Sequence, residues 1–402
     1  MYDWLERAAA RRPRGIAIDH PAGSLTYEEL RSRAAERHAD VRPGERVALP
    51  GDDAFDFAIS LHAVLSRGAT AVPLDPRLSL EERDFRAGAP FAVEPGTATM
   101  MFTSGTTSAP KPVYLTLGNW EANAIGSALA LGLDLKERWL CTMPLAHVGG
   151  LSILLRSTFY ATTVVLHDRF ETEAVLHDLM SAERAVTVVS LVPTMLARLL
   201  DAGLWNPPSL RWALLGGGPI PAPLMERAAA AGVPVAWTYG MTEACSQIAT
   251  FGFPLHGVEL RIVDDEVQVR GGVVSPAALA DDGWLHTGDL GELDAEGRLR
   301  IIGRRSETIV SGGENIAPTE VEEVLLEHPA VADVAVFARR DEHWGERVVA
   351  AVVLRVGQRA DPDELKSFVG ERLARFKVPK EIEFSERLPR TVSGKLLRRE
   401  LV

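Results

Sequence analysis

Cysteine is almost absent from this chain of 402 residues, which contains only Cys141 and Cys245. Both lie in apolar contexts, so the chain has no framework of disulfides. Long apolar runs are also missing, since no stretch reaches the roughly 20 residues that a membrane span requires. Residues 1–7 alternate charged with apolar side chains and lack the basic and then apolar regions of a signal peptide. We therefore expect a soluble, cytoplasmic protein without a membrane span, and a surface helix at its start.

The chain has no excess of basic charge either. It carries 43 Lys and Arg residues against 55 Asp and Glu residues, a formal net charge of −12. This balance argues against nucleic acid as a main partner. An apolar content of 46% supports a large core and excludes a disordered chain, and the length predicts two or three domains.

Short apolar runs alternate with helical patterns through the first three-quarters of the chain. For example, a strand expected at residues 211–215 runs into the glycines of residues 216–218, and a helix is expected at residues 223–231. The next strand is expected at residues 233–237, with its loop at Tyr239-Gly240. Repeated strand–loop–helix units indicate largely parallel sheets that bind ligands at the carboxyl ends of their strands.

The pattern changes near Gly257, where two hairpins are expected. One has an Asp264-Asp265 turn and the other a turn at residues 294–297. After Gly303 a smaller unit of helices and alternating strands begins. In this unit Asp361 stands three residues before Glu364, which is the spacing of a helix capping box.

We therefore predict an α/β fold with two domains. A large N-terminal domain, residues 1–303, combines mixed, mostly parallel sheets and helices with a β-barrel-like layer. Residues 304–306 form a hinge, and residues 307–402 form a small, mobile α+β domain of a normal size for an independent unit.

The segment from Met101 to Lys111 has the chemistry of a phosphate site. Its hydroxyl and backbone N–H groups can surround phosphate oxygens, its glycine allows close approach, and its lysine neutralises charge. The candidate phosphate-binding residues of this segment are Thr103, Ser104, Gly105, Thr106, Thr107 and Lys111. The segment is not the GxxxxGK[ST] phosphate loop, because Pro112 follows Lys111. Taken alone, it is equally readable as a polar turn.

Further motifs carry polar residues suited to a nucleotide. Thr242 can hydrogen-bond a phosphate, and Glu243 can ligate Mg²⁺. Asp289 is suited to ribose hydroxyls, and Arg304 offers a fork of donors. Each residue also has an ordinary explanation as part of a polar loop or turn. Lys395, on a glycine-hinged loop near the C-terminus, either is delivered into an active site or belongs to a solvated basic tail.

The order and spacing of these motifs resemble those of the adenylate-forming superfamily of acyl-CoA synthetases, luciferases and peptide-synthetase adenylation domains. The resemblance begins at residues 25–29 and rests on signatures at residues 68–77, 103–111, 239–243, 286–289, 303–304 and 395. Within the superfamily, residues 144–157, 239–248, 303–306 and 311–315 are similar to the o-succinylbenzoate–CoA ligases of menaquinone biosynthesis. The resemblance implies an AMP-forming acid–thiol ligase.

The resemblance also implies a role for each matching residue. The catalytic residues would be Lys395, His147 as gate of the acyl pocket, Thr242 at the α-phosphate and Glu243 as ligand of Mg²⁺. ATP would be bound by Thr103, Ser104, Gly105, Thr106, Thr107, Lys111, Gly216, Gly217, Gly218, Tyr239, Asp289 and Arg304. The acid would be bound by His147, Arg156, Gly217 and Ser246, the hinge would be Ser306, and CoA would be bound by Ser311, Gly312 and Gly313.

Arg156 also has a physical rationale of its own. A succinylbenzoate keeps a second, unreacted carboxylate, which an arginine can hold through two hydrogen bonds. The alternative for Arg156 is an ordinary ion pair on a helix surface.

The implied reaction uses ATP, Mg²⁺ and coenzyme A with a small-molecule carboxylic acid, and a homodimer is also among the expected partners. An acyl-adenylate forms first; the small domain then rotates about Ser306, and the thiol of CoA displaces AMP. Four features depart from the family pattern. Ser108 and Pro112 replace glycines, Ala146 stands where an aromatic residue often precedes the gating histidine, and the region between Pro76 and Ala98 is shortened. Two alternatives stay open, a ligase for another aryl or acyl acid and a nucleotide-binding module without turnover.

Overall fold

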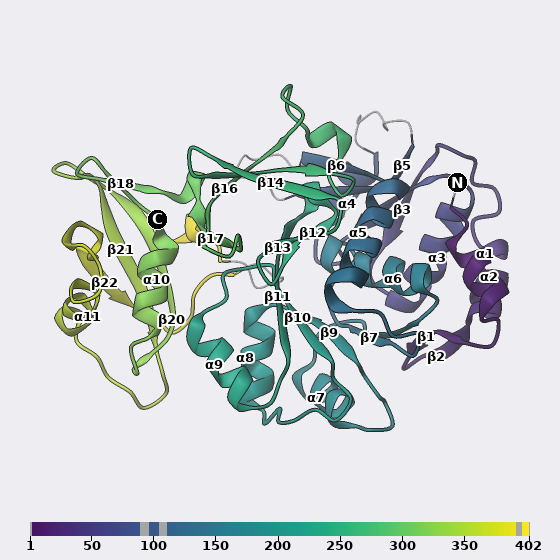
Figure 1. Ribbon diagram of the computed structural model, residues 1–402, viewed down its shortest axis with the longest axis horizontal. Coiled ribbons are helices and arrows are strands. Elements are labelled where there is room, and N and C mark those ends of the chain that lie inside the picture. The colour runs from purple at the N-terminus through teal and green to yellow at the C-terminus, as the bar shows by residue number, and fades with distance from the viewer. Residues whose placement is uncertain (1, 89–95, 104–110, 391–395, 402) are drawn as a thin grey trace. The chain divides into compact units, whose positions relative to one another are not determined.

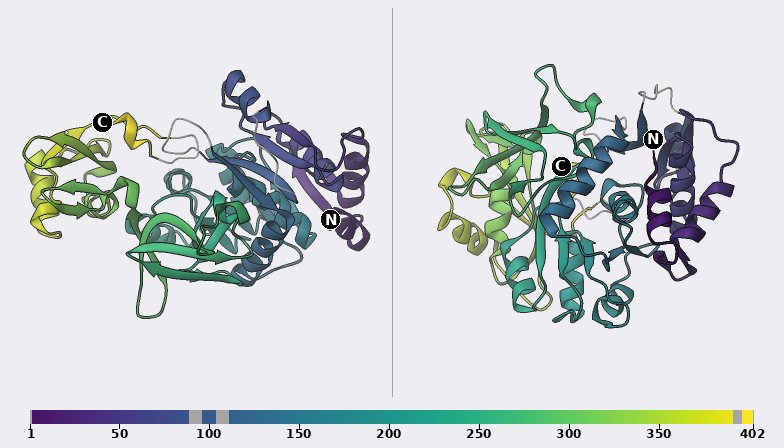
Figure 2. Two further views of the ribbon diagram at one scale, coloured as in Figure 1. Left: turned by 90° about the horizontal axis from the view of Figure 1, so that it is seen from above. Right: turned by 45° about the vertical axis from the view of Figure 1, so that its right-hand side comes forward.

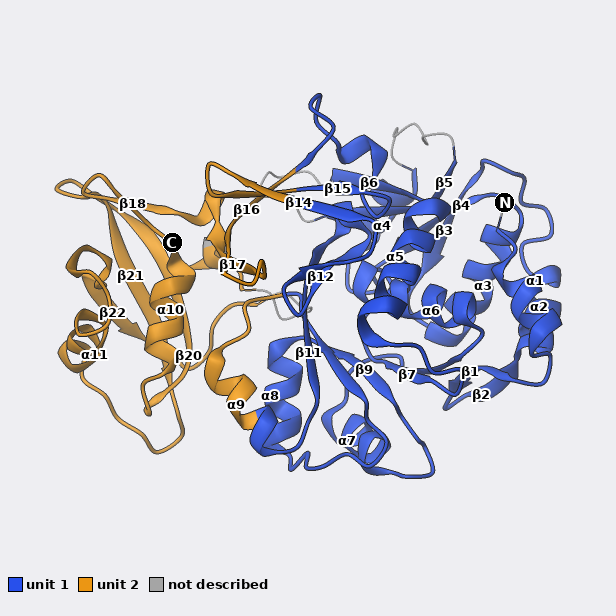
Figure 3. Ribbon diagram, viewed as in Figure 1, with its two compact units in different colours: residues 1–217, 228–260, 269–285 blue, residues 218–227, 261–268, 286–402 orange. Residues whose placement is uncertain are grey.

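The computed structural model describes residues 2–88, 96–103, 111–390 and 396–401. Its two compact units are coloured separately in Figure 3. The first contains residues 1–217, 228–260 and 269–285, and the second contains residues 218–227, 261–268 and 286–402. Each unit therefore combines segments that are distant in the sequence.

A nine-stranded sheet is the centre of the first unit (Figure 1). Its strand order is β13-β12-β11-β10-β9-β7-β8-β1-β2. The strands from β11 to β1 run parallel, while β12 and β13 at one edge and β2 at the other are antiparallel. The strands are β1 (Ile16–His20), β2 (Gly23–Thr26), β7 (Arg138–Cys141), β8 (Thr163–Leu166), β9 (Val188–Leu191), β10 (Trp212–Leu215), β11 (Val235–Met241), β12 (Ser246–Thr250) and β13 (Phe253–Pro254). The mostly parallel sheet expected from the sequence is confirmed.

Helices of the first unit pack on one another and on this sheet. α5 (Leu117–Leu131) and α6 (Val148–Tyr160) pack together and both contact β12. α6 is buried along almost its whole length, which explains why it lacks a polar face. The expected N-terminal helix is present as α1, and it packs on α2 near the purple end of the chain (Figure 2). The other helices of this unit are α1 (Trp4–Arg11), α2 (Tyr27–Glu36), α3 (Ala54–Ser66), α4 (Leu80–Gly88), α7 (Thr172–Met180) and α8 (Pro193–Asp201). α9 (Ala222–Ala230) belongs to the second unit up to Arg227.

A second sheet of the first unit positions the predicted phosphate loop. Its order is β3-β4-β5-β6, with β3 (Arg46–Pro50), β4 (Thr70–Leu74), β5 (Thr97–Thr103) and β6 (Lys111–Thr116). β3, β4 and β5 run parallel, and β6 returns antiparallel to β5. β4 is buried at every residue; residues 71–74 are apolar, and the hydroxyl of Thr70 donates to the carbonyl oxygen of Thr97.

The two predicted hairpins lie in a four-stranded sheet of order β14-β15-β16-β17. Asp264 and Asp265 have φ values of 49° and 64°, the left-handed conformation that a two-residue hairpin turn requires. The strands are β14 (Val258–Val263), β15 (Glu266–Gly271), β16 (Leu285–Leu293) and β17 (Leu299–Arg304). This sheet is the antiparallel layer expected after Gly257.

The C-terminal part of the second unit is an α+β structure. Its sheet contains β18 (Ile309–Ser311), β19 (Glu314–Ile316), β20 (Val331–Asp341), β21 (Gly345–Leu354) and β22 (Glu381–Phe384). α10 (Pro318–Leu326) and α11 (Pro362–Gly370) pack on it around a core that includes Val336, Val348 and Leu365. The predicted capping box is confirmed. The Asp361 side chain accepts from the backbone N–H of Glu364, and the Glu364 side chain accepts from the backbone N–H of Asp361.

One predicted loop is wrong. Tyr239 and Gly240 lie inside β11, because they pair with Ala249 and Gln247 of β12. None of the helices in the described part of the chain has the length and apolar character that crossing a membrane requires.

Candidate active site

The predicted phosphate loop connects two antiparallel strands. β5 ends at Thr103 and β6 begins at Lys111, and these two residues are register partners. β5 is buried up to Phe102, whereas Lys111 is exposed. The hairpin thus closes the ends of the loop and leaves the lysine accessible to an anion. The predicted residues Ser104, Gly105, Thr106 and Thr107, and also Ser108, lie outside the described residues.

His147 belongs to a cluster of charged side chains with Asp75 and Arg77. Its Nε2 atom lies 3.3 Å from Asp75 Oδ2 and 3.3 Å from Arg77 Nη2. Arg77 Nε donates to Asp75 Oδ1 at 2.6 Å, and Arg77 Nη2 donates to Asp75 Oδ2. Burial alone would raise the pKa of Asp75, but hydrogen bonds from His147 and Arg77 hold this pKa well below its usual range. Asp75 is therefore an ionised acceptor that holds both neighbours.

This cluster lies at the sheet edge from which the phosphate loop departs. Ala71 of β4 is paired with Thr99 of the parallel strand β5. Continuing this register by four residues brings Asp75, just beyond β4, opposite Thr103. Parallel sheets bind ligands at the carboxyl ends of their strands. His147 is thus held where a ligand of the phosphate loop would lie.

A short 3₁₀ helix, Thr242–Ala244, joins β11 to β12 and carries several predicted site residues. Tyr239 lies in β11, Thr242 and Glu243 in the turn, and Ser246 at the start of β12, all partly exposed. A Cβ at Gly240 would lie 1.6 Å from the carbonyl oxygen of Ser246, so only glycine permits this crossing.

The donor set of this turn fits a magnesium ion that is bound together with phosphate. Among the described residues, no three or more His, Cys, Asp or Glu side chains gather into a metal cluster. Mg²⁺ is usually held by one or two carboxylates and takes its other oxygens from water and substrate phosphates. The carboxylate of Glu243 beside the hydroxyl of Thr242 matches that requirement.

Two of the predicted glycines follow β10 in the first unit. A Cβ at Gly216 would lie 2.8 Å from the carbonyl oxygen of Thr238, and Gly217 has a φ of +79°. Neither position accepts another residue without strain. Gly218 begins a segment of the second unit.

Arg156 is buried, with 2% of its surface exposed. Its Nε atom donates to Asn123 Oδ1 at 3.1 Å, its Nη2 atom donates to the same oxygen, and its Cζ atom lies 5.5 Å from the ring centre of Trp139. No ion pair links it to an acidic side chain of the described chain. The alternative of an ion pair on a helix surface is therefore wrong.

In the second unit, Asp289 and Arg304 face each other across a hairpin. They are register partners of β16 and β17, and Arg304 Nε lies 2.7 Å from Asp289 Oδ1. Asp289 is buried and Arg304 is half-buried. The pair places a hydrogen-bond acceptor and a hydrogen-bond donor together, and ribose hydroxyls can bond to both.

The predicted hinge and CoA residues also lie in the second unit. Ser306 is in a 3₁₀ turn, Arg305–Glu307, directly after β17. Ser311 ends β18, and Gly312 and Gly313 follow with φ values of +61° and +87°. Lys395 lies outside the described residues.

The sequence profile of AMP-binding enzymes matches residues 5–90 and 89–274, and that of the AMP-binding enzyme C-terminal domain matches residues 320–395. The chain belongs to the AMP-binding enzyme family. The resemblance seen in the motifs is thereby confirmed.

Members of this family with bound ligands share the fold over the full length. The chain is 38% identical to the 2-succinylbenzoate–CoA ligase of Bacillus subtilis, with 99% of this chain and 97% of the relative covered. It matches o-succinylbenzoate CoA synthetase from Bacillus subtilis in complex with the acyl-adenylate intermediate at a TM-score of 0.90, with 38% identity and coverage of 100% and 98%. A structure of that synthetase with ATP and a magnesium ion matches at 0.89, with 37% identity and 99% of each chain covered.

This AMP-binding enzyme is shorter than the Bacillus subtilis ligase that it matches over its full length. The alignment to the Bacillus subtilis ligase spans 475 residues, more than the 402 of this chain. The family profile matches in two pieces that meet at residues 89–90. Both observations agree with a missing part between Pro76 and Ala98.

The motifs did not indicate every residue of the candidate site. Asp75 and Arg77 belong to the signature at residues 68–77, but that motif implies no role for either of them. Asn123 has no signature in the sequence, because a single amide in the middle of a helix carries no local signal. Only the packing of α5 against α6 shows that it faces Arg156.

Proposed function

We propose that this AMP-binding enzyme is an ATP-dependent, AMP-forming carboxylate–CoA ligase that acts on 2-succinylbenzoate. The observation that carries the choice of acid is Arg156, a buried cation held by an amide and an indole. A second carboxylate on the substrate supplies the missing negative charge. The full-length similarity to 2-succinylbenzoate–CoA ligases supports the same acid.

In the first half-reaction, one carboxylate of the acid attacks the α-phosphorus of ATP, and the bond to pyrophosphate breaks. Thr103 and Lys111 hold the β- and γ-phosphates at the closed base of the loop. Thr242 contacts the α-phosphate, and Lys395 stabilises the charge that develops there. Magnesium, held by Glu243, would neutralise phosphate charge. Catalysis by this set is positioning and charge stabilisation.

In the second half-reaction, the thiol of CoA attacks the acyl carbon, and AMP leaves. His147, oriented by Asp75, controls the approach to that carbon. Residues 307–402 turn about Ser306, so that Lys395 gives way to the loop of Ser311, Gly312 and Gly313, which lines the route for CoA. One site can thereby perform two chemistries in turn. Assembly as a homodimer and residence in the cytoplasm remain predictions.

The test is CoA-dependent formation of AMP across a panel of aryl and acyl carboxylates that includes 2-succinylbenzoate. Highest kcat/KM with 2-succinylbenzoate is the expected result. If the enzyme prefers another acid, the proposed substrate is wrong but the proposed reaction stands. If the protein binds ATP but releases no pyrophosphate with any acid, it is a nucleotide-binding module and not a ligase. Arg156→Met gives the matched comparison, because it removes the cation and keeps the volume. We expect it to lower the preference for the dicarboxylate by about tenfold or more.

A further inference from the structure

Arg156 is a buried cation whose described neighbours are all neutral. Besides Asn123 and Trp139, the groups that interact with it electrostatically are Tyr160 and Cys245. Burial raises the pKa of Tyr160 to about 12, so its hydroxyl stays protonated at neutral pH. Cys245 is a buried thiol. Burying a cation without a counter-ion is costly, and proteins rarely retain one unless a ligand supplies the charge.

Asn123 is held in a single orientation by hydrogen bonds on both sides of its amide. Its Oδ1 atom accepts from Arg156, and its Nδ2 atom donates to the carbonyl oxygen of Gln247 at 3.2 Å. The side chain is fully buried, so neither bond is exchanged for water. An aspartate would fit the same volume and would pair with the guanidinium, but it would neutralise the positive charge of Arg156.

The Arg156–Asn123 pair lies beside the predicted acid-binding turn. Asn123 bonds to Gln247, and Cys245 interacts with Arg156; these two residues flank Ser246. We infer that Asn123 is a positioning residue that orients Arg156 without neutralising it, which reserves the guanidinium for a second carboxylate on the acid substrate. The part of this inference that concerns the substrate rests on the proposed function. Because the surroundings exclude water, the interaction is stronger than at a surface.

Asn123→Asp tests the inference, because it adds an internal counter-ion at the position of the amide. Formation of AMP is measured with 2-succinylbenzoate and with its two monocarboxylate analogues, 2-butyrylbenzoate and 4-oxo-4-phenylbutanoate, each of which keeps one of the two carboxylates. The analogue that supports formation of AMP is the one that keeps the reacting carboxylate and lacks the second. We expect the KM for 2-succinylbenzoate to rise by about tenfold or more, while the KM values for that analogue and for ATP change by less than about twofold. An equal rise for 2-succinylbenzoate and that analogue, or no rise for either, would overturn the inference.

Leu129→Asp is the matched control. It adds the same charge to the same helix, at a side chain that is 65% exposed. We expect it to leave both KM values within about twofold of those of the wild type.

A thermal-unfolding cycle without substrate separates failure of the inference from failure of the proposed function. Asn123→Asp is introduced into the wild type and into Arg156→Met. If Arg156 has no other counter-ion, the new aspartate lowers Tm by several degrees less in the wild type than in the Arg156→Met background. Equal shifts would overturn the inference whichever acid the enzyme uses. Absence of wild-type activity on 2-succinylbenzoate, together with unequal shifts, would overturn only the choice of acid.

Discussion

At the scale of single residues, Asp75 holds the candidate site together. It is buried, it accepts two hydrogen bonds from the Arg77 side chain and one from the Arg77 backbone, and it lies 3.3 Å from His147. Arg83 also fixes the loop beyond Asp75 by donating to the carbonyl oxygens of Pro76 and Leu78. The position of His147 therefore depends on a loop that is far from it in the sequence.

Asp75→Asn should lower kcat/KM for the acid by about tenfold, roughly 1.4 kcal/mol, because an amide bonds the guanidinium and the imidazole more weakly than a carboxylate does. KM for ATP should stay unchanged. Asp52→Asn is the control, since Asp52 forms a more exposed ion pair with Arg83 at 3.1 Å. An equal loss in both variants would show that Asp75 does not act through His147.

At the scale of elements, His62 connects three segments of the first unit. It lies in α3, fully buried; its Nδ1 atom is 2.6 Å from the hydroxyl of Tyr2, and its Nε2 atom is 3.2 Å from Thr158 Oγ1 of α6. Burial lowers the pKa of His62 to about 4. In the unfolded chain the pKa of this histidine is about 6.5. Between pH 6.5 and 4, His62 is therefore protonated in the unfolded chain but neutral in the folded chain.

The stability contributed by neutral His62 is complete above pH 6.5 and falls as the pH drops towards 4. From pH 7.5 to pH 4.5, His62 should lower the free energy of unfolding by about 2–3 kcal/mol. Urea unfolding at the two pH values should therefore show a smaller loss of unfolding free energy for His62→Gln than for the wild type. His256→Gln, at an exposed position, should behave as the wild type does. Parallel curves for His62→Gln and the wild type would contradict the prediction.

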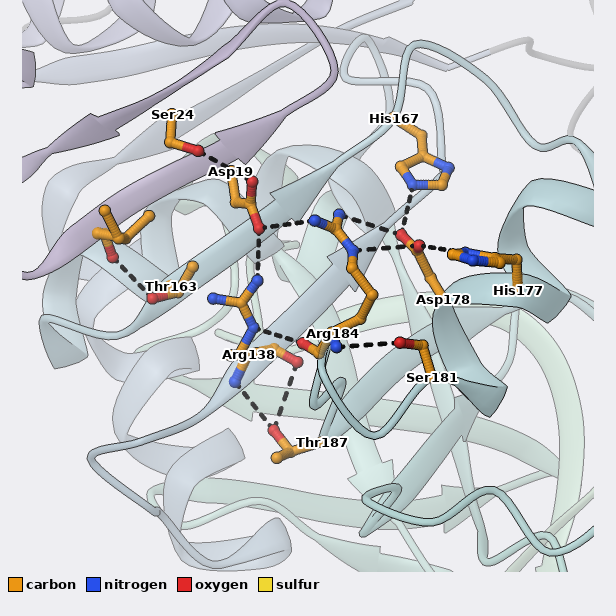
Figure 4. A network of polar contacts seen from close by, with 11 residues as sticks. Asp19, Ser24, Arg138, Thr163, His167, His177, Asp178, Ser181, Arg184 and Thr187 are labelled. Atoms are coloured by element: carbon orange, nitrogen blue, oxygen red, sulfur yellow. Dashed lines mark hydrogen bonds and ion pairs between the residues drawn. The ribbon is translucent and has the colours of Figure 1, made fainter.

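A network of charged side chains ties the strands of the nine-stranded sheet to α7 (Figure 4). Arg184 donates to Asp178 and to Asp19, and His167 Nε2 lies 2.9 Å from Asp178 Oδ2. Burial would raise the pKa of Asp178, but these hydrogen bonds lower it to about 2. The charge of Asp178 therefore stabilises the fold above pH 4, and this contribution is lost as the pH falls towards 2.

Asp178→Asn should lower the free energy of unfolding by about 1–2 kcal/mol at pH 7, and the difference from the wild type should shrink as the pH approaches 2. Chemical denaturation across this range measures both effects. Glu171→Gln breaks an exposed pair with Arg169 just before α7, and its cost should stay below about 0.5 kcal/mol. A pH-independent cost for Asp178→Asn would refute the electrostatic explanation.

Local chemistry and tertiary packing account for what the sequence could and could not predict. The Asp264-Asp265 turn and the Asp361 capping box were predictable because their partners are a few residues apart. The extension of β11 through Tyr239 was not, because it depends on pairing with β12. In the site, the identity of Arg156 pointed to an anion, but its burial and its contact with Asn123 arise only when α5 packs on α6.

At the scale of the whole molecule, the C-terminal segment is anchored to the second unit by Arg398. Its Nη2 atom donates to both oxygens of Glu322 at 2.8 Å, and its Nε atom donates to the carbonyl oxygen of Val336 at 3.0 Å. Glu322 is buried, which makes this a firm attachment for a chain end. Lys395 stands three residues before Arg398 in the sequence, so we expect this lysine to move with residues 307–402 in the proposed rotation.

Lys395→Ala should reduce formation of the acyl-adenylate by about 100-fold or more, because the cation at the developing charge is lost. Formation of the thioester from a supplied acyl-adenylate should keep the wild-type rate, since the proposed rotation about Ser306 removes Lys395 from the site before that step. Single-turnover measurements of pyrophosphate release and of thioester formation separate the two half-reactions. Lys366→Ala removes a lysine from α11 that pairs only with Asp363 among the described residues, and it should leave both rates unchanged. If Lys395→Ala slows both half-reactions equally, the lysine serves the fold or both steps, and one site alternating between two domain orientations is not the mechanism.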